Sequence, residues 1–175
     1  EPPLTSTELD LLLTEPEHAL TPALRAVARS RFWPGMRPLP LWTDTQLQAA
    51  SKTEQELARF SEDVARDHGR LIILYVPNPL QVGVRECSVG RFVDRVDSGV
   101  LLPADSGVQA WLRTVTARHG IQFMDPSAAM RSAADARGDA PPFYLRADCH
   151  WSAAGHQFMA DYLADWYAAL KGPRP

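Results

Sequence analysis

The hydrophobic pattern in the middle of the chain predicts a helix followed by a buried strand. Apolar side chains recur at helical spacing after Thr53, and the sequence TEQE pairs Thr53 with Glu56 in the form of a capping box at a helix start. Gly69 supplies the expected helix stop. The apolar run RLIILYVP, residues 70–77, then predicts a strand buried on both faces, as in a parallel sheet covered by helices.

The same order of elements comes a second time further along the chain. A helix is expected where apolar positions recur on one helical face, and the sequence RHG, residues 118–120, closes it. The sequence IQFMD, residues 121–125, is typical of a strand. Two successive helix–strand units predict an α/β fold. The apolar positions of this second helix are Val108, Trp111, Leu112 and Val115.

The N-terminal third has a less regular pattern. Residues 7–32 predict one or two helical pieces that break near Pro16 and Pro22, and residues 33–42 form a proline-punctuated loop. A long connection, residues 78–104, separates the two helix–strand units, and its length indicates a functional loop or an excursion over one face of the sheet.

The C-terminal third predicts two helices. A short alanine-rich helix is expected over residues 127–137, and a longer one from about Ala153 to Lys171, with Ser152 placed to cap its start. The longer helix carries an apolar stripe, and Gly172 ends it. The stripe consists of Phe158, Tyr162, Leu163, Trp166 and Leu170.

Composition and charge narrow the class of protein. A length of 175 residues with 45% hydrophobic content favours one compact domain, with a proline-interrupted segment of uncertain structure over residues 1–50 and an α/β core over residues 51–172. The net charge of -3 comes without a basic block, which argues against a nucleic-acid partner. No apolar run reaches the roughly 18 residues that a membrane span needs. The chain begins with Glu1 rather than Met, which is consistent with removal of residues upstream.

The two cysteines, Cys87 and Cys149, are too far apart in the sequence for a Cys-x-x-Cys redox pair or a zinc knuckle. Two interpretations remain open. They form one disulfide in an oxidising compartment, or they are two ordinary buried thiols.

The sequence DCHWSAAGH, residues 148–156, concentrates groups that can do chemistry just before the last helix. In an extended chain positions i and i+2 point to the same side, so we expect Asp148 and His150 to project together from the loop that enters this helix. The motif resembles the last block of the SGNH (GDSL-like) hydrolase and O-acyltransferase superfamily, in the branch with an Asp-x-His-Trp motif that includes proteins O-acetylating bacterial polysaccharides. The runs LIILYVPNPLQV and GIQFMD also resemble strands of that superfamily.

This resemblance implies a flavodoxin-like, three-layer α/β/α fold with a mainly parallel sheet. It implies ester hydrolysis or O-acyl transfer on an acyl ester or glycan substrate, without a cofactor, in a periplasmic or extracellular location. His150 would take the proton of a serine hydroxyl, and Asp148 would orient the imidazole. Trp151 would form a wall of the acyl pocket, although packing in the core is the simpler interpretation.

The chain departs from the superfamily where the nucleophile is expected, because no Gly-Asp-Ser block occurs in it. Ser106, in the sequence ADSGV, is a weak nucleophile candidate that is better placed to cap a helix. Asn78 follows a strand and is a candidate oxyanion donor, or else an ordinary Asn-Pro turn.

Three explanations for the missing serine stay open. The serine lies on a longer polypeptide, of which this chain is the C-terminal part, or on a partner chain. Alternatively it is one of the serines present, in a rearranged order, or the chain kept the fold and lost the chemistry. A fragment without its first parallel strand would expose a sheet edge and need a partner piece to cover it.

Two functions from other classes compete with the enzyme hypothesis. The first is a non-catalytic SGNH-like module that binds a glycan or a protein partner. The second is a metal site formed by Asp148, His150 and His156, which have ligand chemistry suited to first-row metals but lack an evident fourth ligand.

Overall fold

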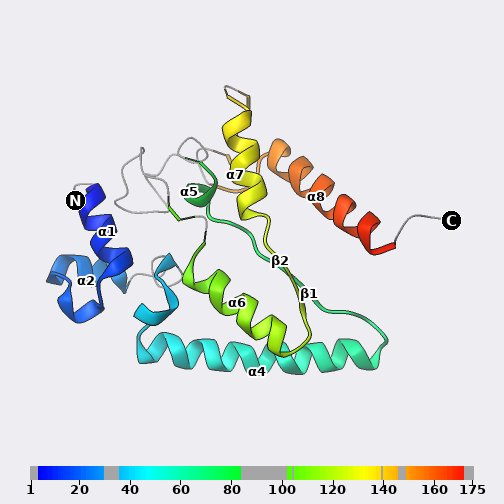
Figure 1. The fold of residues 1–175 in the computed structure, drawn as a ribbon, viewed down its shortest axis with the longest axis horizontal. Coiled ribbons are helices and arrows are strands. Elements are labelled where there is room, and N and C mark those ends of the chain that lie inside the picture. Colours follow the sequence, from blue (N-terminus) through cyan, green and yellow to red (C-terminus); the bar gives the residue numbers. More distant parts are fainter. Residues whose placement is uncertain are drawn as a thin grey trace. The chain divides into compact units, whose positions relative to one another are not determined.

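The structure is a computed structural model that describes residues 4–29, 36–83, 102–103, 105–138, 140–145 and 149–171. The chain forms two compact units, whose elements are labelled in Figure 1. We call residues 4–75 and 105–125 the sheet unit. We call residues 1–3, 76–104 and 126–175 the motif unit, because it contains the Asp-x-His-Trp motif. The single domain expected from the sequence, with its α/β core over residues 51–172, stays a prediction.

The sheet unit begins with short helical pieces separated by prolines, which confirms the breaks expected near Pro16 and Pro22. Helix α1 (Ser6–Thr14) starts with a capping box between Thr5 and Glu8. The 3₁₀ helix η1 (Glu17–Ala19) has Pro16 as its N-cap, and α2 (Pro22–Ala28) has Pro22 as its first residue. A proline suits both places, because neither needs its missing N–H. The buried leucines of these pieces are Leu4, Leu9, Leu12, Leu20 and Leu24.

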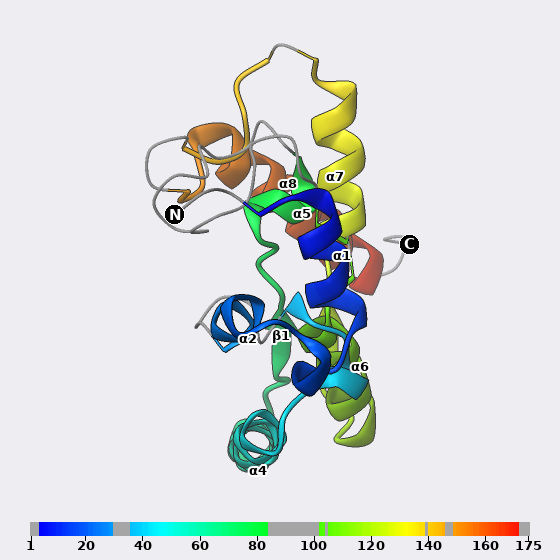
Figure 2. The same ribbon diagram turned by 90° about the vertical axis from the view of Figure 1, so that its left-hand side faces the viewer.

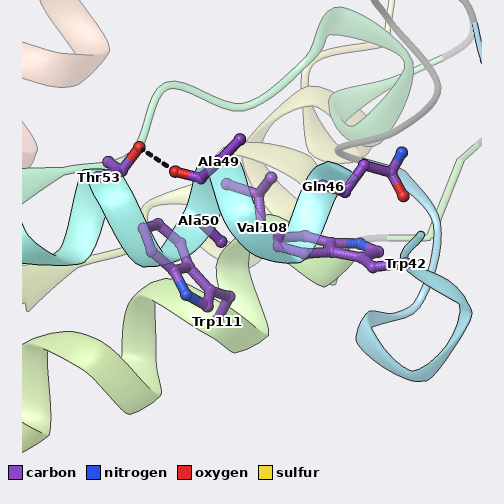
Figure 3. Close-up of a pocket in the computed structure, with 7 residues that line it drawn as sticks. All are labelled: Trp42, Gln46, Ala49, Ala50, Thr53, Val108 and Trp111. Carbon is purple, nitrogen blue, oxygen red and sulfur yellow. Dashed lines mark hydrogen bonds between the residues drawn. The ribbon is translucent and has the colours of Figure 1, made fainter. Parts of the chain in front are cut away.

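The helix expected to have Thr53 as its N-cap begins ten residues earlier, with Thr43 as its N-cap. After the 3₁₀ helix η2 (Leu39–Leu41), helix α4 (Asp44–Arg66) begins with Thr43 as its N-cap. The capping box there joins Thr43 to Gln46, so the expected box at Thr53 and Glu56 is wrong. The residues before Thr53 contain no helix breaker, and each added residue contributes one more backbone hydrogen bond. Thr53 therefore lies inside the helix, where its hydroxyl donates to the Ala49 carbonyl at 2.9 Å (Figure 3).

The two expected strands pair in parallel. Strand β1 (Ile72–Leu74) and strand β2 (Gln122–Met124) align with Ile73 opposite Phe123. Helix α6 (Gly107–Arg118) precedes β2 and packs against it, whereas α4, seen nearly end-on in Figure 2, precedes β1. The order helix–strand, twice over, is therefore confirmed, and the fold is compatible with the α/β class.

The sheet is smaller and more open than expected. Among the described residues it has two strands, and β1 is only part of the run 70–77. Ile72 is 36% exposed and Val76 is 55% exposed, so burial of this run on both faces is wrong for the described part of the chain. The three-layer arrangement stays a prediction.

The motif unit consists of helices around a small core. Its helices are α5 (Pro79–Val82), α7 (Ser127–Ala136) and α8 (Ala153–Lys171), and α5 and α7 pack together. Helices α7 and α8 lie where the sequence predicts them. Most of the connection expected over residues 78–104 lies outside the described residues. The core contains the buried Val82, Met130, Phe143 and Tyr144, with Ala133, Ala134, Trp151, Ala154 and Phe158 packed against it. No helix in the described ranges is both long and apolar enough to cross a bilayer.

Candidate active site

The described residues of the Asp-x-His-Trp motif, Cys149 to Trp151, lie on one arm of a hairpin whose two arms are held by backbone contacts. Tyr144 and Trp151 form an antiparallel bridge. One step closer to the hairpin tip, the Leu145 N–H donates to the His150 carbonyl at 2.7 Å. His150 is therefore the residue of its hairpin arm at which the pairing of the two arms ends. Its side chain is exposed and has interaction partners. Asp148, the other half of the expected pair, lies outside the described residues.

The residue between Asp148 and His150 is not extended. Cys149 has a φ of 59°, in the left-handed region, and its N–H donates to the Leu145 carbonyl at 2.8 Å. The assumption of extended backbone that placed Asp148 and His150 on one side is therefore wrong at this residue. Cys149 is disulfide-bonded, and Cys87, the other cysteine of the chain, lies outside the described residues.

Ser152 joins the hairpin to helix α8. Its N–H donates to the Phe143 carbonyl at 2.7 Å, and its hydroxyl donates to the Pro142 carbonyl at 2.6 Å. The same hydroxyl oxygen accepts a hydrogen bond from the Gly155 N–H at 3.3 Å. These contacts confirm Ser152 as the cap of α8. They also fix the arm of the hairpin that carries His150.

Tyr144 anchors the other arm. Its side chain is 2% exposed, and its hydroxyl donates to the Pro77 carbonyl at 2.7 Å. The hydroxyl also lies 4.0 Å from the sulfur of Met130. A buried hydroxyl needs such a partner, because an unpaired one costs free energy. The contact ties the hairpin to the segment that begins with Pro77 and Asn78.

Trp151 packs against the core of the motif unit, as the simpler interpretation expected. Its ring meets the His156 ring edge-on, with centroids 5.5 Å apart. Its indole nitrogen is buried and has no hydrogen-bond partner among the described residues. A role as a wall of an acyl pocket stays a prediction.

Asn78 is the N-cap of helix α5, and its side chain is oriented by the cap. Its Oδ1 accepts a hydrogen bond from the Leu80 N–H at 2.9 Å, while its own N–H donates to Oε1 of Gln81 at 2.9 Å. Because the acceptor end of the amide is occupied by the helix start, the Nδ2 donor points away from it. The structure therefore bears out the turn at Asn78, whereas its role as an oxyanion donor stays a prediction.

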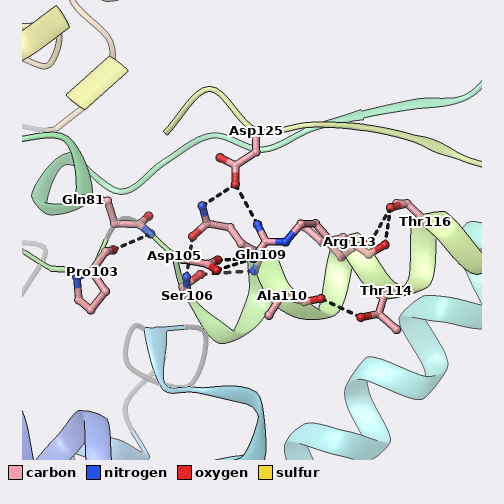
Figure 4. A network of polar contacts seen from close by, with 11 residues as sticks. Gln81, Pro103, Asp105, Ser106, Gln109, Ala110, Arg113, Thr114, Thr116 and Asp125 are labelled. Atoms are coloured by element: carbon pink, nitrogen blue, oxygen red, sulfur yellow. Dashed lines mark hydrogen bonds and ion pairs between the residues drawn. The ribbon is translucent and has the colours of Figure 1, made fainter. Parts of the chain in front are cut away.

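Hydrogen bonds of Gln81 and Arg131 hold the helix that Asn78 caps. The side chain of Gln81 is fully buried and donates to the Pro103 carbonyl at 3.3 Å (Figure 4). Arg131 on α7 donates from Nε to the Gln81 carbonyl at 2.6 Å and from Nη2 to the Leu102 carbonyl. Burial lowers the pKa of Arg131, and the nearby Asp135 opposes this effect. The guanidinium thus fixes α5, and with it Asn78, against α7.

Ser106 is a helix cap, as the sequence analysis favoured. Its hydroxyl oxygen accepts a hydrogen bond from the Gln109 N–H at 3.4 Å, and its own N–H donates to Oε1 of Gln109 at 2.9 Å (Figure 4). The residue is 5% exposed. A nucleophilic serine needs a free hydroxyl next to a base, so this environment argues against Ser106 as the nucleophile.

The start of α6 carries a polar network that the sequence analysis did not find. Asp125, directly after β2, accepts hydrogen bonds from Gln109 at 2.8 Å and from Arg113 at 3.4 Å (Figure 4). Arg113 also pairs with Asp105 at 2.6 Å, and this hydrogen bond raises the pKa of Arg113. The network holds α6 to the end of β2.

An apolar hollow of about 240 Å³ opens between α4 and α6 in the sheet unit (Figure 3). The rings of Trp42 and Trp111 lie 6.4 Å apart and at 41° to each other, and the Trp42 indole N–H donates to the Arg37 carbonyl at 3.0 Å. The hollow contains no titratable side chain and none of the site residues expected from the sequence. Its lining residues are Trp42, Gln46, Ala49, Ala50, Thr53, Val108 and Trp111.

The metal alternative gains no support from the described residues. Within the described ranges, no group of three or more His, Cys, Asp or Glu side chains is placed to hold a metal ion. The expected set of Asp148, His150 and His156 includes Asp148, which lies outside those ranges.

Most of the chain matches a known protein family. Residues 41–174 match the family described as an SGNH hydrolase-like domain, acetyltransferase AlgX. The chain belongs to this family. Neither a curated protein nor a solved structure matches the chain significantly.

Family membership confirms the resemblance that the Asp-x-His-Trp motif indicated. The matched range includes both strands, Asn78 and the complete motif. An SGNH hydrolase-like acetyltransferase domain supports a general role in acyl transfer or ester hydrolysis.

Proposed function

We propose that the chain takes part in serine-dependent O-acyl transfer or ester hydrolysis, with His150 as general base and Asp148 as the carboxylate that orients it. The observation that carries this proposal is the anchored hairpin of a family member. Its motif is held by Tyr144 on one arm and Ser152 on the other. A catalytic base must be held in a defined place, and these contacts supply the support.

In the proposed reaction a serine Oγ attacks the acyl carbonyl carbon while its proton moves to the His150 imidazole. The carbonyl oxygen becomes an oxyanion, and Nδ2 of Asn78 is the side-chain donor that we assign to it. The leaving alkoxide takes the proton from His150, which leaves an acyl-serine. A glycan hydroxyl or a water molecule then gives its proton to His150 and attacks the acyl carbon. The bond between the acyl carbon and the serine Oγ breaks, and His150 returns the proton to this Oγ.

The serine is not assigned to a position in the chain. Ser106 caps α6 and is buried, so we favour a nucleophile on another part of the polypeptide or on a partner chain. We propose a glycan O-acetyl group as the substrate, because the family description names an acetyltransferase. A periplasmic or extracellular location is also proposed, and the disulfide at Cys149 is consistent with it.

A serine-directed fluorophosphonate probe tests the catalytic pair on the full-length protein. We expect the wild type to be labelled and His150→Ala to be labelled about a thousandfold more slowly, because the base that activates the serine is gone. The matched control is His18→Ala, which removes an exposed histidine from η1 in the sheet unit. Equal labelling of wild type and His150→Ala, or none in either, contradicts the proposal.

Asn78→Asp tests the oxyanion donor separately. An aspartate keeps an oxygen that can accept from the Leu80 N–H and so keeps the cap of α5, but it has no N–H to give to an oxyanion. We expect about a hundredfold loss of kcat for hydrolysis of p-nitrophenyl acetate at an unchanged melting temperature. An unchanged kcat would remove Asn78 from the mechanism.

A further inference from the structure

Cys149 has an unusual backbone conformation for its residue type. Among the described residues, the non-glycine residues with positive φ are His68 and Cys149, both at 59°. His68 ends a helix, with its N–H bonded to the Ala65 carbonyl, and such ends often adopt this conformation. Cys149 instead lies in the catalytic motif, where a side chain with a Cβ pays a free-energy cost for the left-handed conformation. Such residues persist when the surroundings hold them in place.

The left-handed residue closes the tip of the hairpin. The Cys149 N–H donates to the Leu145 carbonyl at 2.8 Å, and the Leu145 N–H donates to the carbonyl of the next residue, His150, at 2.7 Å. Both bonds join Leu145 to Cys149 or to its neighbour His150, so the backbone conformation of Cys149 affects both. Hairpin tips commonly place glycine or asparagine at such a position, because these residues enter the left-handed region at low cost.

The disulfide is the restraint that we assign to the left-handed conformation of Cys149. A glycine at this position would need no such restraint, because it enters the left-handed region at low cost. Cys149 is disulfide-bonded, so the rotation of its side chain is covalently restrained. The hairpin arms are fixed independently, through Tyr144 on Pro77 and Ser152 on Pro142. A change in the backbone angles of Cys149 would therefore change the direction of the His150 side chain, while the two hairpin arms stay in place.

We propose that Cys149 is a positioning residue for His150. Its left-handed conformation, held by the disulfide, closes the hairpin tip and aims the imidazole. This inference rests on the proposed function for its catalytic consequence, whereas its structural part can be tested without activity.

The variants Cys149→Gly and Cys149→Ala form a matched pair. Both remove the disulfide, but only glycine enters the left-handed region without strain. We expect the Leu145 amide to exchange its hydrogen about tenfold faster in Cys149→Ala than in Cys149→Gly, because the alanine favours an opened tip. We also expect kcat for p-nitrophenyl acetate to fall about tenfold in Cys149→Ala at a similar KM, with Cys149→Gly close to wild type.

A third variant, Cys87→Ala, removes the only other cysteine of the chain and keeps the Cys149 side chain. It is expected to behave like Cys149→Ala, since a non-glycine residue then occupies the left-handed position without its restraint. Equal amide exchange in Cys149→Gly and Cys149→Ala overturns the proposal, as does a Cys87→Ala variant with wild-type exchange. If the wild type hydrolyses no ester, the proposed function fails, but the exchange rates still decide whether Cys149 holds the tip.

Discussion

Gly155 lies in the first turn of α8, where the helix start passes the carbonyl of Phe143. A Cβ built on Gly155 would overlap that carbonyl oxygen and would lie 3.3 Å from the Cβ of Trp151. The same carbonyl accepts the hydrogen bond from the Ser152 N–H that holds the hairpin. The substitution Gly155→Ala therefore sets a gain in helix propensity against a clash with the backbone of the motif hairpin.

The two effects have different sizes. Replacing glycine by alanine inside a helix normally stabilises it by about 1 kcal/mol. The overlap here is with backbone rather than with the end of a flexible side chain, so α8 and the hairpin must separate. Overpacking of this kind costs about 1–3 kcal/mol, and a weakened Ser152 hydrogen bond costs about 1 kcal/mol more. We expect a net destabilisation of about 1–3 kcal/mol.

Thermal unfolding followed by circular dichroism measures this difference. A protein of this length loses about 2–4 °C of melting temperature per kcal/mol, so Gly155→Ala should melt several degrees below wild type. The control is Ala164→Gly, at an exposed position of the same helix, which reports the propensity effect alone and should cost about 1 kcal/mol. If Gly155→Ala is as stable as wild type or more so, the close approach of hairpin and helix does not exist as described.

Two further substitutions test the anchor of the hairpin and an ion pair of the sheet unit. Tyr144→Phe removes the hydroxyl that donates to Pro77, so we expect a loss of about 1–2 kcal/mol in urea unfolding, and no loss would contradict the anchoring role. The hydrogen bond from His119 lowers the pKa of Glu54 from its ordinary value of 4.5. The ionised Glu54 therefore stabilises the folded protein above pH 4.5, and this stabilisation is lost as the pH falls through the lowered pKa. Glu54→Gln should therefore lose less stability than wild type between neutral and acid pH in urea titrations, whereas Glu56→Gln, at an exposed position of the same helix, should follow wild type.

Local features were predictable because they depend on neighbouring residues. Ser106 and Ser152 cap the helices that the sequence placed after them, since a serine directly before an apolar periodic stretch can satisfy the first free N–H groups. The same reasoning failed at α4, where two sequences of capping-box form compete and local pattern does not rank them. The longer helix from Thr43 prevails because the residues up to Thr53 add backbone hydrogen bonds.

For the candidate site, the sequence predicted which residue types take part but not how their side chains are oriented. The Asp-x-His-Trp motif indicated the family, whereas the orientation of the Asn78 amide depends on its contacts with Leu80 and Gln81. The polar network around Asp125 was missed because its partners, Gln109 and Arg113, come from a helix rather than from the strand that precedes Asp125.

The sequence by itself determined the two successive helix–strand units and the helix caps at Ser106 and Ser152, because these depend on residues a few positions apart. Only the tertiary structure decided which distant groups meet. Tyr144 reaches the Pro77 carbonyl across 67 positions, and the fully buried Arg37 donates to the Leu12 carbonyl at 2.9 Å. The left-handed conformation of Cys149 is another feature that only the tertiary structure decided, because a cysteine has no intrinsic preference for it. Such conformations and pairings arise when packing and cross-links outweigh what each residue would adopt alone.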